Sequence, residues 1–276
     1  MKLSLSTRIA KSADRKDIAA IPFEDLAPLA AFWGFKGVSM RASAISINSS
    51  HTRRTEIRDV LVHNNLAVSM VMGDVSLATN SPAATQAVRD IEPYLNLAAD
   101  LGANLIRVML HDERDIPFVR HAADQAAERV MVLSHQIHWG TLCETVENAI
   151  NTVHSVDREN FGITYEPANL MACGDDYGPN AIALLAPHLV NVYFQNVKLS
   201  RTGGHTFWTR ARGRVSLDYV ALDDPSGLDP HLIIEALQYQ GYRGWFTVHQ
   251  PLRDGQSVAE AVQEAALILG PVVSVQ

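Results

Sequence analysis

Polar side chains suited to proton transfer or to hydrogen bonding stand at the ends of short apolar runs in this 276-residue chain. Gln136 ends VMVLSHQ, Glu166 ends FGITYE, Gln195 ends VNVYFQ, and His249 closes the apolar part of WFTVHQ. A histidine exchanges protons near neutral pH, and a carboxylate beside a buried strand is costly unless it is paired. We therefore expect Glu166 and His249 to be catalytic, with His249 as the general base or acid and with Gln136 and Gln195 binding substrate hydroxyls.

Eight strand-like runs must position these residues, and they begin near residues 3, 37, 66, 104, 130, 161, 190 and 245. Segments of helical period separate most of them, which predicts parallel strands joined by right-handed crossovers. Eight such units favour one α/β domain over 1–276, a closed (β/α)8 TIM barrel, with a doubly wound open sheet as the alternative. No Gly-x-Gly-x-x-Gly follows a run, which counts against a dinucleotide site.

Helix boundaries are readable between several runs. The spacing of Thr141 and Glu144 predicts a capping box before 146–153, and a helical segment is expected over 82–99. Asp229 and Pro230 predict a helix start, and Gly241 predicts its end.

The segment 198–224 has no helical period and is long for a connection in a compact domain. Such segments are usually functional, so this one is a candidate lid over the site. It carries His205 and Trp208, which could contact a sugar, and three arginines that could bind an anion, Arg210, Arg212 and Arg214.

Composition limits the function classes. The chain has 47% hydrophobic residues and a formal net charge of −7, which fits a globular protein without an electrostatic footprint for nucleic acid or anionic membranes. No apolar run approaches the length of a membrane span, and the start does not read as a secretory signal. Cys143 and Cys173 lack metal-site spacing and suit a reducing cytoplasm.

Four segments together resemble the xylose isomerase-like TIM-barrel superfamily of sugar isomerases and epimerases, which also contains the AP endonuclease family 2 enzymes. They are VLSHQIHWGTLCETVENA, FGITYEPANLMACGDDYGP, LVNVYFQNVKL and GYRGWFTVHQP, and the resemblance covers nearly the whole chain. It implies a Glu-x-His pattern after the fifth strand, Asp-x-x-Asn after the sixth, His-x-Lys-Asp on the seventh and Glu at the end of the eighth. In that family the Glu, Asp, His and final Glu bind one divalent metal, which polarises a sugar carbonyl.

This sequence departs from that pattern at each metal-ligand position. Gln136 stands for the first Glu, Glu166 for the Asp, the segment 193–196 for His-x-Lys-Asp, and His249 for the last Glu. His138 and Asn169 are retained. The resemblance therefore implies a divergent subfamily with an altered metal site.

The cofactor is left open by these substitutions. Because hard dications prefer anionic oxygen ligands and imidazole suits Zn²⁺, a metal held by Glu166, His249, Gln136 and His138 would be Zn²⁺ or Mn²⁺ ahead of Mg²⁺. A site without metal is the other reading.

The sequence thus predicts a cytoplasmic sugar isomerase or epimerase that abstracts a proton α to a carbonyl of a monosaccharide or polyol derivative. A keto-sugar lyase or dehydratase is the alternative reaction, and a non-catalytic sugar-binding barrel is the alternative class. A small carbohydrate is the expected partner, without nucleic acid or membrane, and a homo-oligomer is left open. The residues expected to contact substrate are Gln136, His138, Gln195, Asn169, His111, His205, Trp208 and Arg107.

Overall fold

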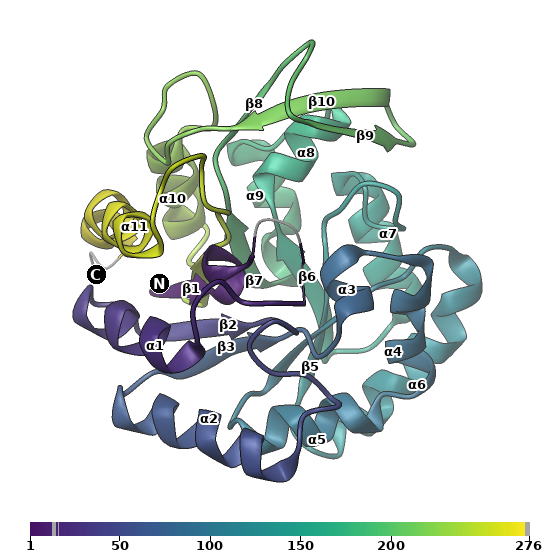
Figure 1. The fold of residues 1–276 in the computed structure, drawn as a ribbon. Coiled ribbons are helices and arrows are strands. Elements are labelled where there is room, and N and C mark those ends of the chain that lie inside the picture. The colour runs from purple at the N-terminus through teal and green to yellow at the C-terminus, as the bar shows by residue number, and fades with distance from the viewer. Residues whose placement is uncertain (13–14, 16, 274–276) are drawn as a thin grey trace.

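Eight parallel strands close into a barrel in the computed structural model, which describes residues 1–12, 15 and 17–273 (Figure 1). Neighbouring strands follow the chain from β1 to β7, and β11 closes the ring between β7 and β1. Each barrel strand begins within two residues of the predicted position, so the predicted (β/α)8 barrel is confirmed. The barrel strands are β1 (Lys2–Ser6), β2 (Gly37–Met40), β3 (Ala67–Val71), β4 (Leu105–Val108), β5 (Val132–Gln136), β6 (Phe161–Tyr165), β7 (Leu189–Phe194) and β11 (Trp245–Val248).

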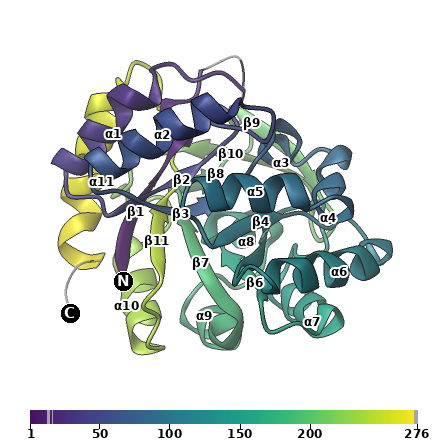
Figure 2. The same ribbon diagram turned by 90° about the horizontal axis from the view of Figure 1, so that it is seen from below.

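Helices surround the barrel and bury its outward apolar side chains (Figures 1 and 2). As predicted, the Asp229 side chain caps the helix that starts at Pro230. No helix among the described residues is long and apolar enough to cross a membrane. The helices are α1 (Phe23–Phe32), α2 (His51–His63), α3 (Val75–Thr79), α4 (Gln86–Arg89), α5 (Glu92–Asp100), α6 (Ile116–Ala127), α7 (Val146–Val156), α8 (Pro167–Cys173), α9 (Pro179–Leu185), α10 (Pro230–Tyr239) and α11 (Val258–Val273).

Two helix expectations were wrong in detail. The segment 82–99 divides into a 3-10 turn (Pro82–Thr85), α4 and α5, with Pro93 in the first turn of α5, where its missing N–H costs nothing. The capping box is absent because Thr145, not Thr141, accepts a hydrogen bond from Asn148 N at the start of α7. Glu144 instead accepts from Arg210 N at 2.8 Å.

The barrel interior below its carboxyl end is polar. Hydroxyl pairs cross it between strands, with Ser4 2.7 Å from Ser69 and Ser39 2.6 Å from the Tyr193 hydroxyl. Since side chains alternate along a strand, Leu3 and Leu5 lie on the opposite face from Ser4. The inward positions are therefore the polar ones, and continuing the same parity beyond each strand leads to the side chains of the barrel mouth.

The segment expected to be a lid forms a three-stranded antiparallel sheet in the order β8 (Val197–Leu199), β10 (Gly213–Tyr219) and β9 (His205–Thr209). It lies beside α8, at the top of the view in Figure 1. Arg210, between β9 and β10, reaches across to neighbouring loops. Its Nη2 donates to His111 O at 2.9 Å, and its Nη1 donates to Thr141 O at 3.4 Å.

We expect Arg210→Ala to loosen this hairpin without unfolding the barrel. The change removes charge-assisted hydrogen bonds worth about 1.5–3 kcal/mol each when well formed. Hydrogen exchange of amides in 205–217 should accelerate while the melting temperature changes little. Arg214→Ala, an exposed change in the same hairpin, is the matched control. Equal exchange in both variants and the wild type would contradict the role assigned to Arg210.

Candidate active site

A cavity of about 800 Å³ opens at the carboxyl ends of the barrel strands. It is roofed in part by the three-stranded sheet, since Gly204, Thr206 and Phe207 are among its lining residues. Of the residues predicted to form the site, those that line it are Arg107, His111, Gln136, His138, Glu166, Asn169, Gln195, His205 and His249. The sequence-derived set therefore converges on one cavity.

Trp208 is the exception among the predicted residues. Its side chain is 71% exposed and is absent from the cavity wall. On β9 the cavity is lined by His205, Thr206 and Phe207, at the start of the strand, and the wall ends before Trp208. Phe207 stacks on Trp139 with ring centroids 3.8 Å apart. Arg210, Arg212 and Arg214 do not line the cavity either. Arg210 instead donates hydrogen bonds to backbone carbonyl groups.

Glu166 is the fully buried acid at the centre of the site, placed directly after β6. Its Oε2 accepts from the amides of Gln136 and Asn169, the latter at 2.9 Å, and its Oε1 accepts from Gln195 Nε2 at 2.5 Å. Arg8 Nη1 donates to Gln195 Oε1 at 2.7 Å and so fixes which end of that amide faces Glu166. With two lone pairs on each oxygen, Oε1 keeps one acceptor position that none of the hydrogen bonds among the described residues uses.

The pKa of Glu166 is raised to about 7 because burial penalises the ionised carboxylate. The charge of Arg8 and the hydrogen bond from Gln136 act against this shift. A carboxyl group whose pKa lies near neutrality is poised to both take and return a proton at working pH.

His249 follows β11 and is held on three sides. Its Nδ1 lies 2.9 Å from Ser6 Oγ, its Nε2 lies 3.3 Å from Arg41 Nη1, and its ring stacks on Tyr193 at 4.1 Å. A guanidinium only donates, so Nε2 is the acceptor and the ring proton is on Nδ1. Burial, followed by the charges of Arg8 and Arg41, lowers the pKa of His249 well below its usual range. The imidazole is therefore neutral at pH 7.

The remaining predicted residues brace the cavity wall. His138 Nε2 lies 2.5 Å from Asn80 Nδ2, and its Nδ1 faces Trp139 O at 2.9 Å. His111 lies between two backbone carbonyls, with Nε2 3.0 Å from Ser81 O. These contacts tie the loops after β3, β4 and β5 together around the cavity.

Sequence reasoning missed most of the positive charge of the site. Arg8, Arg41 and Lys11 line the cavity together with Arg107. The missed arginines follow β1 and β2, just as the predicted polar residues follow later strands. The positions of Arg8 and Arg41 at or just after the ends of predicted strands would have indicated these residues. The prediction instead relied on the histidine, glutamine and glutamate residues at such positions.

The side chains predicted to bind the divalent metal that the resemblance implies do not fit such an ion. Glu166 receives amide N–H groups on both oxygens, and Nε2 of His249 accepts from a guanidinium, which a cation would have to displace. Gln136 presents its amide nitrogen to Glu166, and His138 is bonded to Asn80. Among the described residues, no three His, Cys, Asp or Glu side chains group as metal ligands. The predicted metal set of Glu166, His249, Gln136 and His138 is thus replaced by a hydrogen-bonded network.

We expect the wild-type protein to bind Mn²⁺ at least about 100-fold more weakly than a Gln136→Glu/His249→Glu variant. The variant restores two anionic groups, and a contact charge pair is worth about 4 kcal/mol before desolvation at an effective dielectric of about 20. Calorimetric titration of both proteins measures the difference. Equal affinities would show that the loss of two carboxylates at positions 136 and 249 does not weaken metal binding.

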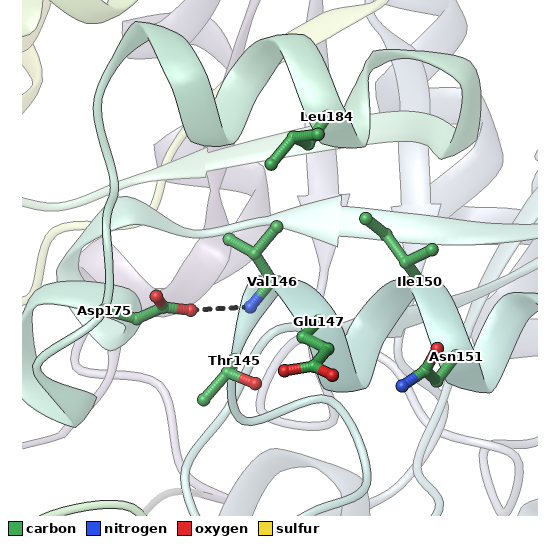
Figure 3. Close-up of a pocket in the computed structure, with 7 residues that line it drawn as sticks. All are labelled: Thr145, Val146, Glu147, Ile150, Asn151, Asp175 and Leu184. Carbon is green, nitrogen blue, oxygen red and sulfur yellow. Dashed lines mark hydrogen bonds between the residues drawn. The ribbon is translucent and has the colours of Figure 1, made fainter.

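A second, smaller pocket of about 470 Å³ lies on the outer surface beside α7 and α9 (Figure 3). Its acid Asp175 accepts a hydrogen bond from Val146 N at 2.7 Å, which satisfies the first turn of α7. The lining residues are Thr145, Val146, Glu147, Ile150, Asn151, Asp175 and Leu184. Since Asp175 and Thr145 accept hydrogen bonds from the first turn of α7, we place the candidate active site in the cavity at the carboxyl end of the barrel and not in this pocket.

Solved structures with the same architecture come from several organisms. One is the probable 3-DHS dehydratase AsbF involved in petrobactin synthesis from Bacillus anthracis, at 18% identity over 98% of this chain and 99% of that chain, with a TM-score of 0.71. Another is a xylose isomerase-like TIM barrel protein from Mycobacterium smegmatis in complex with magnesium, at 17% identity, 99% and 97% coverage, and a TM-score of 0.69. A third is D-psicose 3-epimerase with D-tagatose from Clostridium cellulolyticum H10, at 16% identity, 99% coverage of both chains, and a TM-score of 0.67.

At such identities these structures share the fold with this chain, and their reactions do not transfer. No curated protein matches the chain. The family description "Xylose isomerase-like TIM barrel" matches residues 27–269, which is most of the chain. The protein therefore belongs to the xylose isomerase-like TIM-barrel family.

Proposed function

We propose that this protein is an isomerase that abstracts a proton α to the carbonyl of a small polyhydroxylated substrate, with Glu166 as the base. The observation that carries the proposal is a fully buried carboxylate whose pKa is raised to about 7 and whose Oε1, within the described part of the chain, accepts one hydrogen bond. General acid–base residues work best with such values. The amide donors of Gln136, Asn169 and Gln195 fix its orientation.

In this proposal Glu166 Oε1 takes the proton, and the electron pair left on carbon moves onto the carbonyl oxygen as an enediolate. Arg41 is the electrophile that stabilises the negative charge, in place of a divalent ion. The neutral imidazole of His249 positions the guanidinium group of Arg41, because Nε2 of His249 lies 3.3 Å from Nη1 of Arg41. Preorganised donors in a dry site are usually the largest contribution to such catalysis.

One base favours isomerisation over epimerisation. Glu166 can return the proton to the adjacent carbon on the same face, while the proton of the neighbouring hydroxyl passes to the former carbonyl oxygen, so that the carbonyl moves by one carbon. Inversion at one carbon instead needs a proton donor on the opposite face. His249 is neutral with its one ring proton directed at Ser6, so it is a poor second donor. We therefore shift the role of base from His249, where the sequence had placed it, to Glu166.

The test is solvent-deuterium incorporation. The protein is incubated in D₂O with a panel of aldoses, ketoses and their acid and phosphate derivatives, and products are followed by NMR. Deuterium at the carbon next to the carbonyl, together with an isomeric product, supports the proposal. An unsaturated product would reassign the enzyme as a lyase, because elimination starts from the same carbanion. Tight binding without any deuterium uptake would indicate a non-catalytic binding barrel.

A further inference from the structure

The cavity holds three arginines and one buried carboxylate. Arg8, Arg41 and Arg107 line it with Glu166, while Lys11 and Asp254 add one group of each sign. Arg41 is 4% exposed and Arg107 is 1% exposed, so water does little to solvate their charges. Buried charges are normally paired, because an isolated one carries a large desolvation cost.

The protein partners of these two guanidinium groups are all neutral. Arg107 donates to Leu77 O at 2.7 Å and to Asn80 Oδ1, and Arg41 donates to Ala78 O at 3.1 Å and contacts His249. Within the described part of the chain, neither has a carboxylate at ion-pair distance. Their charges are therefore uncompensated by contact.

Each of the two groups also has an unused donor. The Nε atoms of Arg41 and Arg107 are buried and have no hydrogen-bond partner in the described chain. Such atoms are rare in native structures, and they show that the protein leaves the hydrogen-bonding capacity of both guanidinium groups incompletely used. Both side chains belong to the cavity wall, so a ligand there can approach their guanidinium groups, while the buried Nε atoms themselves stay out of its reach.

Glu166 offsets the charges of Arg41 and Arg107 without forming an ion pair with either. Its oxygens are bonded to amides rather than to guanidinium groups. Arg8 is the arginine whose charge acts on it most strongly, and Arg8 reaches it through Gln195. An ion pair with Arg41 or Arg107 is thus left to an external anion.

We propose that the ligand of this cavity carries an oxyanion, a carboxylate or phosphate group, which binds Arg107 and shares the guanidinium group of Arg41 with the carbonyl oxygen that Arg41 polarises. This substrate class rests on the proposed function: the substrate would be an acidic or phosphorylated hydroxycarbonyl compound. Planar guanidinium groups match the oxygens of both anions, and a cavity of about 800 Å³ is large enough for a small sugar derivative.

Binding is measured without turnover, by calorimetry and by thermal stabilisation, which follows from preferential binding to the folded state. The probes are D-gluconate, D-glucose 6-phosphate, inorganic phosphate and, as the neutral comparison, D-glucose. We expect at least one anionic probe to bind and to raise the melting temperature more than D-glucose at equal concentration. The gluconate and phosphate probes separate the two anion chemistries.

Arg107→Gln removes one charge and its unused donor, and we expect it to weaken binding of the anionic probe by about 10-fold or more. Arg107→Lys keeps the charge but lacks the planar guanidinium that can bind an oxyanion through two N–H groups. Its affinity for the anionic probe should therefore lie between those of the wild type and Arg107→Gln. Arg58→Gln makes the same charge change on the exposed face of α2 and should bind like the wild type. If Arg107→Gln does not fold, Arg41→Gln replaces it in the comparison.

The inference is overturned if no anionic probe binds, if D-glucose binds as tightly as the anions, or if Arg107→Gln and Arg58→Gln bind the anion equally. Its failure is distinguishable from failure of the proposed function. Anion binding by a protein that exchanges no deuterium would refute only the isomerase. Deuterium exchange on a neutral sugar that is unaffected by Arg107→Gln would refute only the anion site.

Discussion

Glu166→Gln should lower the rate of solvent-deuterium exchange by about 10²–10⁴-fold, the usual contribution of a general base. The substituted amide has nearly the same shape but no basic oxygen. It also leaves the charges of Arg8, Arg41 and Arg107 without the carboxylate that shares their cavity. Binding of an anionic probe should persist in this variant, because the arginines remain. Exchange is measured by NMR in D₂O at saturating substrate.

Glu166→Asp is the matched control, since it keeps the carboxylate and withdraws it from its amide donors by one methylene. Its rate should lie between those of the wild type and Glu166→Gln. Exchange by Glu166→Gln at the wild-type rate would show that another group is the base. His249 would then be the first candidate, because it shares the cavity.

The architecture could be predicted because strand and helix patterns alternate and the intervals fit barrel units. The alternation of side chains along the predicted strands also predicted part of the candidate active site. Gln136, Glu166, Gln195 and His249 each continue the inward parity of their strand, and all line the cavity. Parity predicts direction, so these residues converge without any knowledge of their neighbours.

The bonds made by those residues could not be predicted from the same pattern. Whether His249 meets a metal or a guanidinium depends on Arg41, which lies 208 positions away in the chain. Arg41 follows β2 with the parity of Ser39, and Arg107 is an inward position of β4. Because the chain as a whole is acidic, its net charge of −7 gave no hint of a local positive cluster.

The sheet of β8, β9 and β10 escaped prediction for a different reason. β8 and β9 are short and largely exposed, so only β10, where Val215 and Leu217 are buried, shows the alternation of a strand with one buried face. Glycines also interrupt the segment, at Gly203, Gly204 and Gly213, and Gly213 has a positive φ of 78° in the turn before β10. Sequence reasoning placed a covering segment here and could not give it a structure.

The pH profile of exchange should rise to a plateau through an apparent pKa of about 7, which belongs to Glu166 because the base acts when deprotonated. Arg8→Gln should move this rise to higher pH by about one unit. The charge of Arg8 is the largest effect that holds the pKa of Glu166 down against burial, and Arg8 also orients Gln195 toward the carboxylate. At pH 7 the variant should therefore be slower, and at higher pH it should recover most of its rate.

Arg8→Lys retains the charge, so its profile should stay closer to that of the wild type. His249→Asn should lower the plateau, because Arg41 loses the imidazole that positions it, and should leave the midpoint of the rise nearly unchanged. A midpoint that disappears in His249→Asn would assign the titration to the histidine. Such a result requires His249 to be protonated near neutral pH, against the burial and the neighbouring arginine charges that lower its pKa.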